Sequence, residues 1–530
     1  MKPDLILHNA KVFTVNPNQP WAQAVACANG RIIAVGSNDD VLNISRPSTQ
    51  KLNAQGKLVL PGLTDGHAHF LEYAVRHQQV SLLKVKNFSD VIRMIQERAK
   101  ITKPGEWIEG WGWDETLWEG VEPTAALLDS IVPDIPIYLE RQDMHTWWVN
   151  TKAMQLAKVL EGAADAYNCK IERDKEGKPT GIFTEWGAKA MFSSAIPAPT
   201  FSQLKEFALS GFDEAHKHGI TCIHDQRMDG EKGDSWDIWQ ALKKEGKLGV
   251  RLHANLHAAD ISDVAKLGVG SGFGDENLWI GHVKVFADGT LGTRSAFMLE
   301  EYSDMPGQFG MEVTPYETFM DIGRRAQKAG LAISVHAIGD RAVRNSIEVF
   351  AKYPSRTIPH RIEHTQVIKP EDLPRLAKHN IFSSVQPAQQ AMDWRNANSR
   401  WGERTKYAYA YRSLLNHGAV LVFGSDVTAS PFNPMEHVYA AVLRQDTDGL
   451  PEGGWHPEEC LTVAEAIRAY TMGPAMLSGK ANVQGSISQG KFADLTVLSD
   501  NLFEIEPERI LDVVVDNTII SGKVVFERNV

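Results

Sequence analysis

Side chains that commonly bind metal ions stand at the ends of apolar runs in this chain. His67 and His69 follow the run that ends at Leu63, with one residue between the two imidazoles. In an extended backbone this spacing points both side chains to the same side. Neutral imidazole is the commonest metal ligand in proteins, so the pair predicts part of a metal site. A lone pair of this kind is as often a pair of surface histidines.

Three later residues strengthen the metal hypothesis. His336, His364 and Asp426 each stand at or just past the end of an apolar run. The C-terminal ends of the strands of a TIM barrel converge on one mouth, where residues distant in sequence meet. The four cysteines are far apart and form no CxxC pair. A metal would therefore be bound by histidine and carboxylate rather than by thiolate.

The elements that would position these residues are visible in the middle of the chain. Strand-like runs alternate there with helical patterns, which is typical of an α/β protein with a parallel sheet. The runs suffice for a (β/α)8 TIM-like barrel. The candidate barrel strands are 58–63, 221–224, 251–256, 282–286, 332–335, 361–363, 381–385 and 420–423.

Both ends of the chain are rich in strand-like runs. Asn29-Gly30 lies between two such runs and is a strong hairpin signal. Each end alone has too few strands to bury a core. We therefore expect residues 1–58 and 480–530 to form one small β-sandwich domain beside a barrel domain of residues 59–479.

A long insertion is expected after the first barrel strand. About 150 residues separate the first two candidate strands, far more than a usual connection. We interpret residues of about 71–200 as an inserted lobe over the barrel mouth, where barrel active sites lie. Its Trp113, Asp114 and His145 are candidates for substrate binding, although lobe core is the more frequent role for such residues.

Lys284 stands inside the apolar run of residues 282–286. A buried lysine costs several kcal/mol unless it is paired or modified. An unmodified Lys284 is expected to pair with Asp288 or with a carboxylate of the substrate.

These features resemble the amidohydrolase superfamily, and in detail its YtcJ-like branch, over nearly the whole chain. The resemblance rests on five segments: HVKVFADGTLGTRSA from His282, SVHAIGDRAV from Ser334, HRIEHTQ from His360, FGSDVTASPFNP from Phe423 and GSISQGKFADLTVL from Gly485.

The resemblance implies a cofactor of one or two divalent metal ions, most often zinc. It implies that Asp426 is both a ligand and a proton shuttle, and that Lys284 is carboxylated and bridges two ions. The implied metal ligands are His67, His69, Lys284, His336, His364 and Asp426.

Several other residues are weaker candidates. Glu185 of the lobe is an alternative metal bridge, because a carboxylate can replace a lysine carbamate, although an ordinary lobe glutamate is the more frequent case. His224 and His253 are second-choice ligands near the mouth. Arg294 and Arg341 are weak candidates for binding an acid group of the substrate.

The expected reaction is hydrolysis of an amide-type C–N bond, other than a peptide bond, in a small molecule. A metal of this kind lowers the pKa of its water to about 7 and polarises a carbonyl group. Asp426 would take the proton and pass it to the leaving nitrogen. One alternative is a catalytically silent regulatory or binding protein, against which the intact set of ligand-type residues argues. Another is a metal-dependent esterase, phosphoesterase or lyase on the same barrel.

Composition excludes some partners. The 55 basic and 66 acidic side chains give a net charge of −11, which repels nucleic acids and anionic membranes. No apolar run approaches the roughly 18 residues of a membrane span, and no secretory signal is visible, so the cytoplasm is the expected location. The expected partner is a small-molecule substrate, and the sequence is compatible with a homo-oligomer.

Overall fold

The computed structural model describes residues 2–142, 145–160, 169–227 and 235–529. The chain forms two compact units, one of Met1–Glu72 with Ala208–Val530 and the other of Tyr73–Phe207. Within the described ranges, no helix has both the length and the apolar character that a membrane span requires.

The first unit contains a nearly closed barrel of eight parallel strands. The sheet runs in the order β21-β20-β19-β18-β17-β16-β15-β8, and an isolated parallel bridge between Ala68 and Val427 lies between its two edges. The predicted (β/α)8 fold is therefore confirmed. The strands are β8 (Leu63–Ala68), β15 (Ile220–Asp225), β16 (Arg251–His257), β17 (Leu278–Phe286), β18 (Ile333–Ala337), β19 (His360–His364), β20 (Ile381–Val385) and β21 (Leu421–Phe423).

The predicted first barrel strand, residues 58–63, is wrong. Leu58–Pro61 forms strand β7 of a different sheet, and β8 begins only at Leu63. The amide of Gly62 donates to the carbonyl of Asp494, whereas the amide of Leu63 donates to Gly219 of the barrel. A Cβ at Gly62 would lie 2.3 Å from Thr221 Oγ1, so only glycine fits where the chain changes sheets. One apolar run therefore serves two strands.

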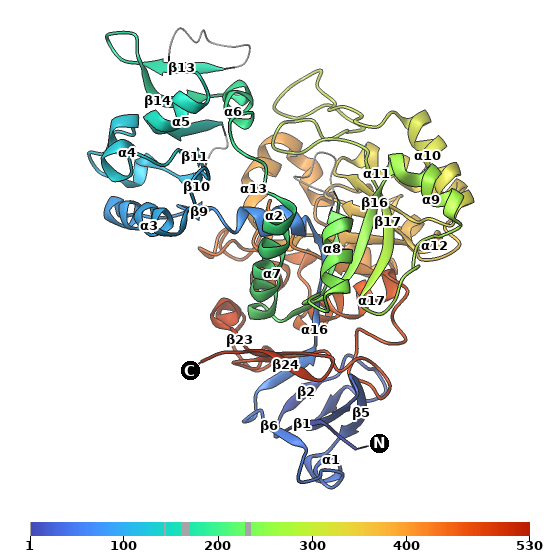
Figure 1. Cartoon of the computed structure of the whole chain (residues 1–530). Helices are drawn as coiled ribbons and strands as arrows, with labels where there is room; N and C mark the ends of the chain where they lie inside the picture. Colours follow the sequence, from blue (N-terminus) through green and yellow to red (C-terminus); the bar gives the residue numbers. More distant parts are fainter. Residues whose placement is uncertain (1, 143–144, 161–168, 228–234, 530) are drawn as a thin grey trace. The chain divides into compact units, whose positions relative to one another are not determined.

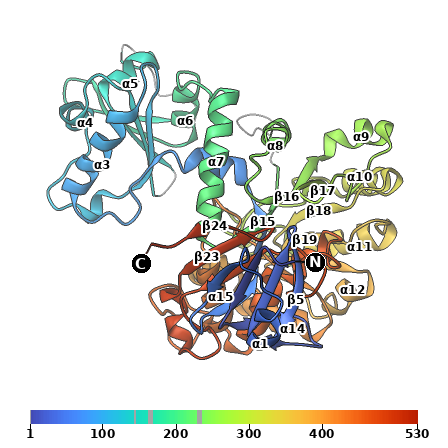
Figure 2. The same cartoon turned by 60° about the horizontal axis from the view of Figure 1, so that its bottom comes forward.

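Helices cover the outside of the barrel, as Figure 2 shows for α11 and α12 beside β18 and β19. Helix α10 buries Phe319, Ile322 and Ala326 at helical spacing and ends at Gly330, whose φ of 70° terminates the helix. The helices of this unit include α7 (Phe201–Lys217), α8 (Ser235–Lys244), α9 (Ile261–Leu267), α10 (Tyr316–Ala329), α11 (Asp340–Lys352), α12 (Leu373–Lys378), α13 (Pro387–Trp401), α14 (Tyr411–Asn416), α15 (Pro434–Leu443), α16 (Val463–Tyr470) and α17 (Met472–Leu477).

Strands from both chain ends lie side by side (Figure 1). One sheet has the order β5-β4-β1-β6 and the other the order β24-β23-β22-β7-β2-β3. The predicted Asn29-Gly30 hairpin joins β4 to β5, with φ values of 50° and 74° at the two turn residues. Apolar residues of both sheets share one core. The strands are β1 (Leu5–His8), β2 (Lys11–Phe13), β3 (Trp21–Ala22), β4 (Ala24–Ala28), β5 (Arg31–Gly36), β6 (Gln50–Asn53), β7 (Leu58–Pro61), β22 (Leu495–Leu498), β23 (Val515–Ile520) and β24 (Lys523–Glu527).

The second unit is inserted between β8 and β15, and it has its own sheet in the order β13-β14-β12-β11-β10-β9. Strand β11 lies in the middle of this sheet, between β12 and β10. The elements are β9 (Val80–Ser81), α3 (Phe88–Ile101), β10 (Ile108–Trp113), α4 (Ala125–Ile131), β11 (Ile137–Arg141), β12 (Thr146–Val149), α5 (Thr151–Leu156), β13 (Lys170–Arg173), β14 (Pro179–Thr184) and α6 (Trp186–Ser193).

Candidate metal centre

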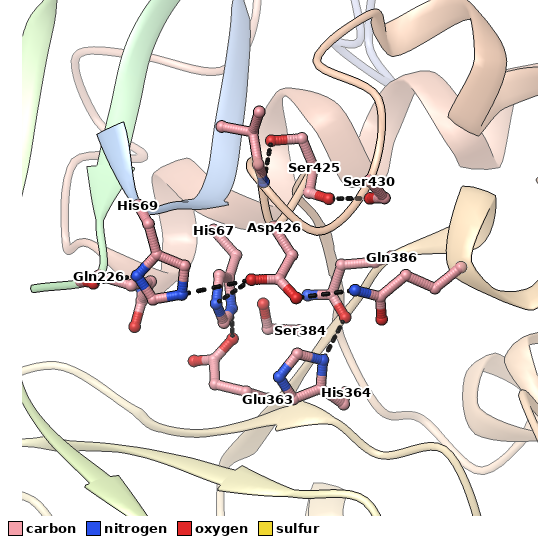
Figure 3. A network of polar contacts seen from close by, with 12 residues as sticks. His67, His69, Gln226, Glu363, His364, Ser384, Gln386, Ser425, Asp426 and Ser430 are labelled. Atoms are coloured by element: carbon pink, nitrogen blue, oxygen red, sulfur yellow. Dashed lines mark hydrogen bonds and ion pairs between the residues drawn. The ribbon is translucent and has the colours of Figure 1, made fainter. Parts of the chain in front are cut away.

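The HxH pair lies at the C-terminal end of β8, and its two imidazoles face the same carboxylate (Figure 3). Nε2 of His67 is 3.2 Å from Asp426 Oδ1, and Nε2 of His69 is 3.3 Å from the same oxygen. All three side chains are buried. The predicted orientation of the pair to one side is therefore what the structure shows.

The proton of His67 is on Nδ1. This nitrogen lies 2.6 Å from Glu363 Oε2. Although burial opposes its charge, the Arg361 guanidinium and His67 hold the pKa of Glu363 well below its usual range. An ionised carboxylate only accepts hydrogen bonds, so Nδ1 donates, and in the neutral ring Nε2 presents a lone pair. That Nε2 is buried and has no hydrogen-bond partner within the described residues.

His69 has the same tautomer. Its Nδ1 lies 2.5 Å from the backbone carbonyl oxygen of Gln226, which only accepts, so in the neutral ring Nε2 again presents a lone pair. Two imidazole lone pairs and a carboxylate oxygen within 3.3 Å repel one another unless a cation or proton lies among them. These three ligand atoms all lie within 4.8 Å of one another, a spacing that could hold a metal ion. The donor set therefore fits a divalent metal.

His336 and His364 lie beside this group. The ring centroid of His364 is 5.2 Å from that of His67 and 4.5 Å from that of His336. His364 Nδ1 donates to Gln386 Oε1 at 2.9 Å, and His336 Nε2 donates to the Gly289 carbonyl at 3.0 Å. Burial lowers the pKa of His336 to about 4 and that of His364 well below its usual value. Both rings are therefore neutral at pH 7, the form that binds metal.

Two ligand-type residues have an unusual backbone conformation. His364 has a φ of 72° and Asp426 a φ of 56°, in the left-handed region that side chains other than glycine rarely adopt. The Asp426 amide donates to the His67 carbonyl at 2.6 Å, which ties the end of β21 to β8. Although burial opposes its charge, the neighbouring histidines hold the pKa of Asp426 well below its usual range. Strain of this kind is found where surrounding structure fixes a functional side chain.

Lys284 is buried on β17, and burial lowers its pKa to about 8. Its ammonium group lies 4.9 Å from the Phe286 ring. The expected pairing with Asp288 does not form. The Asp288 carboxylate instead accepts hydrogen bonds from the backbone amides of Phe297, Ile338 and Gly339, at 2.8 to 3.0 Å.

The lobe residues predicted to bind substrate have other partners in the lobe. Trp113 lies in the lobe core, where its Nε1 donates to the Leu139 carbonyl at 2.9 Å, and its contact with substrate stays a prediction. Asp114 caps the short helix Glu115–Leu117 by accepting from the Thr116 amide at 3.0 Å.

His145 and the proposed bridge Glu185 approach each other within 3.3 Å, with half-exposed side chains. Asp143 and Met144, which precede His145, lie outside the described residues. The barrel unit alone supplies the His67, His69 and Asp426 group. Contact of His145 with substrate and of Glu185 with metal stay predictions.

The two arginines proposed to bind a substrate acid group have protein partners. Arg294 forms an ion pair with Asp304 at 2.7 Å. The Arg341 guanidinium lies 4.8 Å from the centre of the Phe297 ring. Arg294 is therefore paired with a carboxylate of the protein, whereas Arg341 is exposed. Binding of a substrate acid group by either arginine stays a prediction.

The second-choice ligands His224 and His253 are committed elsewhere. Arg361 Nη1 donates to His224 Nδ1 at 3.2 Å, and His253 lies between Trp279 and His282. Both rings are fully buried in the barrel interior. Neither histidine belongs to the group of ligand atoms formed by His67, His69 and Asp426.

The chain is similar to known proteins over nearly its whole length. The model of the amidohydrolase family matches residues 50–526. The chain belongs to the amidohydrolase family. The predicted YtcJ-like resemblance is confirmed by the putative amidohydrolase YtcJ of Bacillus subtilis, which is 29% identical over 99% of both chains.

Other relatives are similar over nearly the whole chain. Protein LONG AFTER FAR-RED 3 of Arabidopsis thaliana is 30% identical, over 99% of this chain and 91% of that protein. The N-substituted formamide deformylase of Arthrobacter pascens is 25% identical, over 99% of this chain and 98% of that protein. A crystal structure of an uncharacterised metal-dependent hydrolase from Pyrococcus horikoshii has a TM-score of 0.77 at 26% identity, covering 95% of this chain and 99% of that one.

Several residues of this amidohydrolase that position the ligands were missed from the sequence. Asp65 accepts from the His67 amide at 3.0 Å and from Ser425 Oγ at 2.6 Å, which joins β8 to the loop that carries Asp426. Glu363 orients His67, and Gln386 orients His364. The sequence feature that could have identified these residues is a charged or amide side chain inside or directly after a buried strand, as in the segment HRIEH.

Proposed function

We propose that this amidohydrolase uses a divalent metal, most often zinc in such sites, to hydrolyse an amide-type C–N bond of a small molecule. The observation that carries the proposal is the convergence of His67 Nε2 and His69 Nε2 on the same oxygen, Asp426 Oδ1, at 3.2 and 3.3 Å. The proposed metal ligands are His67, His69, His336, His364 and Asp426.

The protein's own groups have distinct parts in this proposal. A bound metal would activate a water molecule and polarise the substrate carbonyl group. Glu363 and the Gln226 carbonyl hold the tautomers that direct Nε2 of the HxH pair into the site. Asp426 accepts a proton from the attacking water at Oδ1 and passes it to the leaving nitrogen.

Lys284 is proposed as a further ligand after carboxylation. Burial lowers its pKa to about 8, so a fraction of the side chain is a neutral amine that can add carbon dioxide and release a proton. The resulting carbamate supplies oxygen ligands, which an ammonium group cannot. The rival bridge Glu185 needs no modification. If Lys284→Ala still binds two ions per chain and Glu185→Gln binds one, Glu185 and not the carbamate is the bridge.

The experiment is a substrate screen with the zinc-loaded protein. N-substituted formamides are the first class to test, because a relative of 25% identity is named for their deformylation, followed by acyl amides, cyclic amides and esters. We expect release of an amine from at least one amide class, abolished by a chelator and restored by metal. Metal binding without turnover would favour a silent binding protein. Turnover of esters alone would show that the protein is an esterase and would contradict the proposed hydrolysis of a C–N bond.

A further inference from the structure

The two oxygens of the Asp426 carboxylate have different surroundings. Oδ1 lies 3.2 and 3.3 Å from Nε2 of His67 and His69. Oδ2 accepts a hydrogen bond from Gln389 Nε2 at 2.7 Å. Gln389 is the only partner of Oδ2 within the described residues. This one contact therefore decides which oxygen faces the imidazoles.

A second glutamine fixes the orientation of the first. Gln389 is the third residue of α13, and Gln366 follows the end of β19. Gln366 Nε2 donates to Gln389 Oε1 at 3.5 Å, the upper limit for such a contact. Amide oxygen and nitrogen are assigned from their partners. An ionised Asp426 only accepts, so Gln389 must turn its NH2 group to the aspartate and its oxygen to Gln366.

We propose that Gln389 is a positioning residue that holds Asp426 Oδ2, so that Oδ1 stays directed at the metal ligands and at the water it deprotonates. This inference rests on the proposed function. The terminal torsion of an aspartate is broad, so a carboxylate without this donor rotates and presents either oxygen. A neutral amide orients the carboxylate without placing a positive charge beside the metal, which an arginine or lysine would do.

Helix α13 supplies a matched pair of variants. Gln389→Met keeps the length and helix propensity of the side chain but removes the donor. Gln390→Met makes the same change at the next residue, which is fully buried and whose amide atoms have no hydrogen-bond partner within the described residues. Gln366→Met removes the support of Gln389 while leaving its contact with Asp426 in place.

Three readouts test the proposal: metal stoichiometry, the split between kcat and KM, and the visible absorption of the cobalt(II)-substituted protein. For Gln389→Met we expect unchanged stoichiometry, a kcat lower by about 10–100-fold with little change in KM, and a shifted cobalt spectrum. Gln366→Met should shift the spectrum in the same direction by less. Gln390→Met should match the wild type in all three.

The outcomes separate this proposal from the proposed function. A wild-type protein that binds no metal contradicts the proposed function. A wild type that binds cobalt, together with a Gln389→Met variant of identical spectrum and kcat, overturns only the positioning role. Equal effects in Gln389→Met and Gln390→Met would also overturn it, because they would reflect packing of α13. If Gln389→Met does not fold, an unshifted Gln366→Met spectrum contradicts the proposal.

Discussion

Buried histidines of the barrel interior are held neutral by a directional chain of hydrogen bonds. Trp279 Nε1 donates to His253 Nδ1 at 3.2 Å, so His253 carries its proton on Nε2 and donates to His282 Nδ1 at 3.1 Å. His282 Nε2 in turn donates to the Pro359 carbonyl at 3.0 Å. Burial, together with the charge of nearby groups, lowers the pKa of His253 well below its usual value. Protonation of His253 or His282 at Nδ1 would therefore break the hydrogen bond that this nitrogen accepts.

A further buried histidine, His360, predicts that the free energy of unfolding decreases in acid. His360 is buried, accepts from the Ile333 amide and donates to the Tyr353 carbonyl, and burial lowers its pKa from 6.5 to about 4. Below pH 6.5 the unfolded chain binds protons that the folded protein excludes, so the free energy of unfolding falls as the pH drops from 6.5 towards 4. His360 alone contributes a loss of about 2 kcal/mol between pH 7.5 and pH 5.

The measurement is the urea midpoint of the metal-free protein at both pH values, so that metal release does not contribute. His360→Gln, which removes the ionisable group, should show a smaller difference between the two midpoints than the wild type. Equal midpoints at pH 7.5 and pH 5 in the wild type would contradict the assignment of neutral buried histidines.

At the scale of strands and helices, the sequence predicted which residues gather at the barrel mouth. His336, His364 and Asp426 were visible because each ends an apolar run, and parallel strands bring such ends together. The first strand was misplaced because the continuous apolar run across Pro61 contains no sign that the chain changes sheets at Gly62. That change depends on close packing against Thr221, which is distant in sequence.

The residues that orient the ligands could not be predicted in the same way. Glu363 and Gln389 are ordinary polar residue types. Glu363 lies 2.6 Å from His67, about 300 residues away in the sequence, and Gln389 lies 2.7 Å from Asp426, about 40 residues away. No local sequence pattern indicates such contacts. Trp113 is open to two interpretations for a related reason. A tryptophan among tryptophans fits a pocket as well as a core, and only its contact with the Leu139 carbonyl distinguishes them.

The lobe gives a prediction of its own. Trp113→Ala should destabilise the lobe by about 3–5 kcal/mol, because it removes a large buried side chain and leaves a cavity. Metal content should stay at the wild-type level, since the proposed histidine and aspartate ligands all belong to the barrel unit. Thermal denaturation beside elemental analysis tests this. A variant with wild-type melting behaviour and an altered KM would instead support the predicted pocket role of Trp113.

At the scale of the molecule, the metal site depends on the closed barrel and on its junction with the terminal sheets. The proposed ligands come from β8, β18 and β19 and from the loop after β21, and Lys284 comes from β17. At the opposite end of the barrel, buried Arg251 at the start of β16 forms an ion pair with Asp494 at 2.7 Å and donates to Ser521 at 2.9 Å. Segments far apart in the chain must therefore fold together before any ligand set exists.

The central claim is a metal site in which Asp426 also moves the proton, and bound metal measured beside the hydrolysis rate tests it most directly. Asp426→Asn keeps the shape and one oxygen for coordination but cannot accept the proton. We expect it to retain most of its metal while turnover falls by about 10²–10⁴-fold. His67→Ala and His69→Ala should lose metal and activity together. An Asp426→Asn protein with both full metal content and near-normal turnover would contradict the account.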